Sequence, residues 1–172
     1  LIVEIWNGIW SASNQEALTW FYHWINEGRR LTATSGTDLH EEPPPGVRGA
    51  VNVVYAEDLT EDAIIAAIKA GRSYVSGGPT LLLNVVTESG HEAMLGDTVA
   101  PEAATAVVRW SGAHAGDILR FNVNGRAYRE KIVGEGGEMR WPLAAGQARW
   151  CNAELRDSQD GLWAVTNPIY FG

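Results

Sequence analysis

Asp38 and His40 lie two residues apart in the segment TSGTDLH (residues 34–40), where a predicted strand comes to its end. In an extended chain, residues i and i+2 point to the same side, so the carboxylate and the imidazole can face one metal ion. A neutral imidazole and an ionised carboxylate suit Zn, Mn or Fe without choosing among them. The pattern predicts two ligands of a divalent-metal site, and metal activation of water is the chemistry of a hydrolase.

The remaining histidines do not extend this pair. His23 lies in a segment with helical periodicity, where we expect a packing role, and His91 and His114 lie in glycine-containing turns. A stable metal site normally presents three or four protein ligands. An Asp-x-His pair also occurs in ordinary loops, so its surroundings must decide its meaning.

The first part of the chain alternates predicted strands and helices. Strands are expected over residues 1–6, 31–37 and 51–55. Ser13 to Glu16 has the form of a capping box, so a helix begins there, and Gly28 is expected to end it. Thr60 is expected to cap a second helix that ends at Gly71. This β-α-β-β-α order predicts parallel strands covered by helices.

The second part of the chain has a different pattern. Leu119, Phe121 and Val123 alternate with polar residues, and Asn124-Gly125 predicts a hairpin turn directly after them. Further short strands are expected over residues 81–86, 105–110, 139–143, 150–155 and 162–171. Such a series predicts an antiparallel sandwich, with Pro142 and Pro168 at strand ends or sheet edges.

Composition excludes several classes of protein. The net charge is -8 and the 13 basic residues are scattered, which argues against nucleic acid as a partner. No run approaches the roughly 18 apolar residues of a membrane span. Cys151 is the single cysteine, so an internal disulfide framework is excluded, and the sequence indicates no compartment. The chain opens directly on a strand, so we expect it to be a piece of a longer protein.

Several motifs, in their order, resemble the polymerase-and-histidinol-phosphatase (PHP) superfamily, and most closely its carbaryl-hydrolase-like CehA/McbA branch. They are VEIWNG (3–8), GRR (28–30), TSGTDLH (34–40), VY (54–55), LTEDAI (59–64), AIKAGR (67–72) and TNPIYF (166–171). The resemblance implies an α/β fold for residues 1–78, the terminal β-α units of a distorted (β/α)7 barrel. It implies an all-β antiparallel sandwich module for residues 79–172.

The resemblance also implies roles for individual residues. Asp38 and His40 match the last metal-binding motif of the family and would bind divalent Zn, Mn or Fe. Glu4 and Asn7 match a strand close to the site and would orient substrate or neighbouring groups. Arg30 and Arg48 could contact an anionic small-molecule substrate; the alternative for each is a solvated or locally salt-bridged arginine. The implied activity is hydrolysis of phosphoester, amide or carbamate bonds by a metal-activated water.

The chain departs from the family in lacking an Asp-x-His-x-His motif and the ligands of the middle strands. We therefore expect the other ligands to come from a missing N-terminal barrel segment, and the chain alone to be inactive. The alternative is a non-catalytic binding or structural module, because eight tryptophans could bind carbohydrate or protein. Of these, Trp6 and Trp10 flank the expected site.

Overall fold

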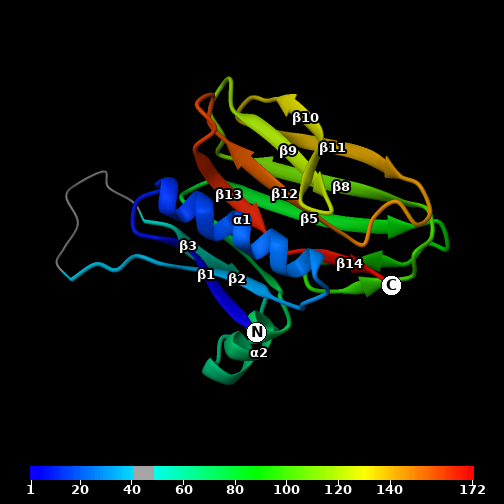
Figure 1. Cartoon of the computed structure of the whole chain (residues 1–172), viewed down its shortest axis with the longest axis horizontal. Helices are drawn as coiled ribbons and strands as arrows, with labels where there is room; N and C mark the ends of the chain where they lie inside the picture. The colour runs from blue at the N-terminus through cyan, green and yellow to red at the C-terminus, as the bar shows by residue number, and fades with distance from the viewer. Residues whose placement is uncertain (41–48) are drawn as a thin grey trace.

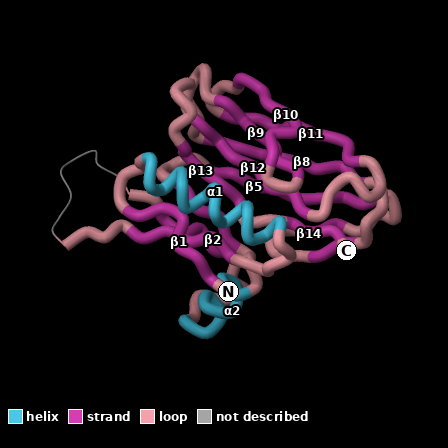
Figure 2. The backbone as a smooth tube through the Cα atoms, viewed as in Figure 1, coloured by secondary structure: helices cyan, strands magenta, loops and turns pink. Residues whose placement is uncertain are grey.

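Strands dominate the computed structural model, which describes residues 1–40 and 49–172 (Figure 2). The described residues form two helices, α1 (Ala12–Asn26) and α2 (Glu61–Lys69). The strands, in chain order, are β1 (Ile2–Asn7), β2 (Thr32–Gly36), β3 (Val51–Val54), β4 (Ser73–Ser76), β5 (Thr80–Thr87), β6 (Glu92–Ala93), β7 (Thr98–Val99), β8 (Ala104–Ser111), β9 (Ile118–Val123), β10 (Arg126–Ile132), β11 (Gly136–Leu143), β12 (Trp150–Arg156), β13 (Leu162–Thr166) and β14 (Ile169–Phe171).

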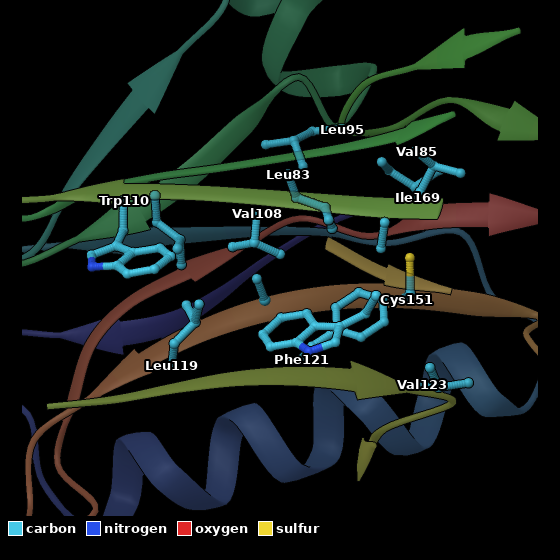
Figure 3. Close-up of a cluster of buried hydrophobic side chains, with 14 of the residues drawn as sticks. Leu83, Val85, Leu95, Val108, Trp110, Leu119, Phe121, Val123, Cys151 and Ile169 are labelled. Carbon is cyan, nitrogen blue, oxygen red and sulfur yellow. The ribbon is translucent and has the colours of Figure 1, made fainter. Parts of the chain in front are cut away.

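Two largely antiparallel sheets pack face to face as a β-sandwich. The larger has the order β10-β9-β12-β13-β4-β3, with β14 and β7 joined to it at β12. The smaller has the order β11-β8-β5-β6. Their inner faces bury one core, which includes Leu83, Val108 and Phe121 (Figure 3). In this core the ring of Phe121 stacks on that of Trp141, with centroids 5.5 Å apart.

The sandwich strands form where period-two alternation predicted them. On β5, Leu81, Leu83 and Val85 are buried, while the residues between them are partly exposed. Asn124 and Gly125 both have positive φ, 53° and 75°, and join β9 to β10 as a tight hairpin. The prediction of a β-sandwich is therefore confirmed, but its larger sheet also contains β3 and β4, which precede residue 79.

Helix α1 lies on the outer face of the larger sheet, beside β1 and β2 (Figure 1). Its residues Leu18, Phe21 and Ile25 are buried in a second core that also takes in Trp150 and Val165 of the sheet. The helix is therefore held by the same sheet that closes the sandwich, and it positions the turn that follows β1.

Two asparagine side chains join β2 to the larger sheet. The Asn52 amide accepts from the Ser35 N–H at 2.9 Å and donates to the Ser35 carbonyl at 2.8 Å. The buried Asn167 amide accepts from the Ala33 N–H at 2.7 Å and donates to the carbonyls of Ala33 and Ser73, at 3.1 and 2.9 Å. A carboxamide offers a donor and an acceptor side by side, as a peptide group does, so each replaces a rung of the β-ladder.

The helix ends agree with the sequence in part. Thr60 caps α2 by accepting from the Ala63 N–H, and Gly28, with a φ of 90°, follows α1, so both predictions are confirmed. The capping box at Ser13 is wrong, because α1 begins at Ala12 with Ser11 as N-cap and no side-chain cap bond.

The expected partial (β/α)7 barrel is wrong, because the fold is mostly β. Only β1 and β2 pair in parallel in the described part of residues 1–78, whereas β3 pairs antiparallel with β4 and β4 with β13. Helix α2 buries only Ala67 and protrudes from the connection between β3 and β4 (Figure 1). Helix α2 does not cross a face of the sheet. The strands on either side of it, β3 and β4, are therefore neighbours and pair antiparallel. The larger sheet takes strands from both sides of residue 78.

Candidate functional site

Asp38 and His40 follow β2 and lie in contact with one another. The Nε2 atom of His40 is 3.1 Å from the Oδ1 atom of Asp38, and the two side chains are 86% and 64% exposed. The strand has already ended at Gly36, and Asp38 has a φ of 49°. The side chains therefore meet through a turn in left-handed backbone, not along an extended strand, and both are open to solvent.

Glu4 and Asn7 lie together at the adjacent end of β1. The Nδ2 atom of Asn7 donates to the Oε1 atom of Glu4 at 2.9 Å. The other carboxylate oxygen, Oε2, lies against Gly36, where a Cβ atom would come within 2.6 Å of it. Any side chain at position 36 would displace the Glu4 carboxylate. Because Gly36 is two residues before Asp38, Glu4 lies close to the candidate ligands.

Asn14 fixes the turn that leads out of β1. Its Oδ1 atom accepts from the Asn7 N–H at 3.0 Å, and its Nδ2 atom donates to the carbonyls of Asn7 and Ile9 at 3.1 and 3.0 Å. The Gly8 N–H also donates to the Gly36 carbonyl at 3.0 Å. The ends of β1 and β2 are therefore held in register next to the Asp38–His40 turn.

The donor types of Asp38 and His40 suit a divalent metal, and the 3.1 Å contact places the Nε2 and Oδ1 atoms side by side. In residues 1–40 and 49–172, however, no three His, Cys, Asp or Glu side chains gather closely enough to hold a metal ion. Glu4 therefore does not complete a three-ligand group with the pair. The described residues fit two ligands of a metal site and not a whole site.

Arg30 lies at the other end of β2 from Asp38 and His40, because it precedes the strand that they follow. Its guanidinium stacks on the ring of Tyr170, 3.8 Å from the centroid, and donates to the Thr98 hydroxyl at 2.9 Å. The structure does not bring it to the candidate ligands. Arg48 lies outside the described residues.

A second charged cluster, which the sequence did not reveal, joins α1 to the larger sheet. The Tyr22 hydroxyl donates to the Glu154 carboxylate at 2.5 Å, and Asn122 and Arg156 donate to the same carboxylate at 2.8 and 2.5 Å. Burial, together with the charge of Glu154, raises the pKa of Tyr22 well above its ordinary value. Glu154 and Arg156 are each 2% exposed, and their partners are protein groups. We interpret this cluster as structural, because it joins α1 to the larger sheet.

The tryptophans of the sandwich are mostly core residues. Trp110 and Trp141 are 8% exposed and Trp150 is 1% exposed, so their ring faces are not available to a ligand. Trp163 of β13 is only half-buried, as is Trp10 after β1. Carbohydrate binding by the buried sandwich tryptophans is therefore not supported.

Comparison with protein-family models, curated proteins and solved structures finds no match to this chain. The fold and the site geometry are therefore the basis of the functional argument. Within the described part of the chain, neither helix has the length and apolar character to cross a lipid bilayer.

Proposed function

We propose that this chain belongs to a divalent-metal-dependent hydrolase and supplies two of its metal ligands, Asp38 and His40. The observation that carries the proposal is the contact between these two side chains just after the end of β2, which pairs in parallel with β1. Glu4 and Asn7, hydrogen-bonded to one another at the same end, support it further. The bonds to be cleaved are phosphoesters or, as the alternative, amides and carbamates.

The residues of this chain would perform distinct tasks at such a site. Asp38 and His40 would hold the metal ion. When bound, such an ion lowers the pKa of its water ligand and polarises the phosphoryl or carbonyl oxygen of the substrate. The Asn7 amide holds the Glu4 carboxylate against Gly36, so Glu4 is oriented to accept a hydrogen bond from substrate or water. Asn14, which binds the Asn7 peptide group, keeps this arrangement fixed.

The remaining ligands are assigned to polypeptide outside the described residues. Among those residues, β1 pairs only with β2, which leaves one edge of a parallel pair open. Parallel sheets are normally covered on both faces and extended by further strands. We expect the chain alone to bind metal weakly and to be catalytically silent.

The test is a titration of this chain with Mn²⁺, followed by NMR of the side chains of its four histidines. Paramagnetic broadening should affect His40 first. His23 is the matched control, because its Nε2 atom lies 3.3 Å from the Glu27 carboxylate and both side chains are about half exposed. Broadening of His40 should disappear in Asp38→Ala, while that of the other histidines should not change.

Equal broadening of His40 and His23 would show only the general affinity of a carboxylate–imidazole pair, and would overturn the proposal. The absence of any selective effect at His40 would do the same.

A further inference from the structure

A groove of about 330 Å³ lies between the turn after β1 and the loop that joins β12 to β13. Trp6 and Trp10 line one side and Trp163 of β13 another, while Asp157 and Gln159 of the loop contribute polar groups. This volume is at the lower end of the range for small-molecule sites. The groove contains neither Asp38 nor His40.

We propose that this groove binds a pyranose ring of a neutral carbohydrate. The rings of Trp6 and Trp10 meet edge to face, with centroids 4.9 Å apart and planes at 69°. They form a corner in which Trp6, only 4% exposed, is the buried supporting wall and Trp10 is the surface open to a ligand. The axial C–H groups of a pyranose carry slight positive charge and stack on the electron-rich face of an indole. Trp10 is half-buried and presents the accessible part of this corner.

The corner is already formed without a ligand. The Nε1 atom of Trp6 donates to the Gly8 carbonyl at 3.0 Å. The ring of Trp6 lies so close to Gly77 that a Cβ atom there would be only 3.2 Å from it. Because Trp6 cannot turn away, a sugar ring would lose little binding free energy to rearrangement of the protein.

The polar side of the groove suits hydroxyl groups. The Oδ1 atom of Asp157 accepts from the backbone N–H groups of Gln159 and Gly161, both at 2.8 Å, which fixes the loop. Within the described chain, neither Asp157 Oδ2 nor the Gln159 carboxamide takes part in a hydrogen bond to another side chain or to the backbone. These atoms can therefore accept from and donate to sugar hydroxyls.

Charge selects among small ligands. Asp157 is the charged residue of the lining, and no Lys or Arg side chain contributes to it. A phosphate or carboxylate would meet a negative charge with no cation to offset it, whereas a neutral sugar meets an acceptor that it can use. The groove thus fits a neutral polyhydroxylated ring and disfavours anions.

The test follows the indole N–H resonances of the isotope-labelled protein during titration with cellobiose and with methyl β-glucoside, with chelator present. We expect the signals of Trp6, Trp10 and Trp163 to shift together. Trp20, which is 49% exposed on α1 and outside the groove, should not respond. Sorbitol carries similar hydroxyls but has no ring face, so it should cause no shift.

Two variants test the assignment to this groove. Trp10→Ala should weaken binding by about ten-fold through loss of stacking, and Gln159→Ala by several-fold through loss of one hydrogen bond. Trp20→Ala, the matched control, should leave the affinity unchanged. Gln159 is exposed, so its substitution keeps the test valid if Trp10→Ala fails to fold.

Absence of a shift with either sugar would overturn the proposal. An equal response to sorbitol, or an unchanged affinity in Gln159→Ala, would overturn it as well. A response to 2-naphthol without a response to either sugar would show a general aromatic-binding groove and would also overturn the proposal. Because chelator is present, these outcomes do not depend on whether Asp38 and His40 bind metal.

Discussion

Replacement of Asn167 by alanine should separate β2 from the larger sheet. The Asn167 side chain is 1% exposed and supplies both hydrogen bonds of the Ala33 peptide groups, besides two to Ser73. Alanine cannot make any of them. The Ala33 N–H and carbonyl would then lie buried without the hydrogen-bond partner that Asn167 provides.

The magnitude follows from these two groups. An unpaired buried polar group costs about 1–3 kcal/mol, so two of them would lower the free energy of unfolding by about 2–6 kcal/mol. Water that enters the vacated space recovers part of this loss. We therefore expect about 3 kcal/mol, which is large for a single substitution in a domain of this size.

The assay is urea denaturation of the wild type, Asn167→Ala and the control Asn84→Ala. Asn84 is half-buried on the outer side of β5. Within the described chain its side chain makes no hydrogen bond, so its loss should change stability by less than about 0.5 kcal/mol. Amide exchange at Ala33 should accelerate in Asn167→Ala alone. If the two variants are equally stable, the reasoning about the buried carboxamide is refuted.

Three further predictions concern local packing and ionisation. Gly96→Ala should be destabilised far more than Gly28→Ala in thermal denaturation, because both glycines have positive φ but only a Cβ at position 96 would collide with backbone, at 1.9 Å; similar melting temperatures would refute this. Tyr22→Phe should lower stability by about 1–3 kcal/mol at neutral pH, because Glu154 loses a donor. Since the pKa of Tyr22 is raised on folding, its neutral form stabilises the protein fully below the ordinary value of 10.0, and this stabilisation is lost as the pH rises through the raised pKa. Denaturation against pH should therefore show a smaller alkaline loss in Tyr22→Phe than in the wild type, and identical profiles would contradict the assignment. Burial raises the pKa of the Cys151 thiol, so a thiol reagent should label it only after denaturant is added, and rapid labelling of the native protein would show that the thiol is exposed.

Local signals in the sequence predicted much of the sandwich. Alternation around Leu119 to Val123 and the Asn124-Gly125 turn specify a hairpin through neighbours in sequence. The cap at Thr60 is likewise local. Each of these features depends on a few consecutive residues, so composition and spacing were sufficient to find them.

The pairing of β3 with β4, and of β4 with β13, could not be predicted in this way. It depends on contacts between residues far apart in sequence, and the helical pattern of α2 suggested a crossover that the structure does not make. Asn52 and Asn167 were also missed, because an asparagine that replaces a β-ladder rung has the same sequence signature as one in a turn. Asn14, which fixes the turn after β1 from within α1, was missed for the same lack of a local signal.

For the candidate site, the sequence placed Asp38 and His40 on one side of the chain, and the structure brings their side chains into contact for a different geometric reason. Their role as metal ligands stays a prediction. The i, i+2 argument assumed an extended strand, whereas the contact arises from the left-handed conformation of Asp38. The placement of Arg30 was open to reasoning from the sequence, since residues that precede and follow one strand lie at its opposite ends.

The most direct test of the proposed metal site is the amount of Zn²⁺ and Mn²⁺ held by the protein at equilibrium with free ion, measured by mass spectrometry after equilibrium dialysis. The wild type should hold more metal than Asp38→Ala/His40→Ala, and His23→Ala should match the wild type. Equal metal content in the wild type and the double variant would contradict the assignment of Asp38 and His40 as ligands, and with it the proposed hydrolase.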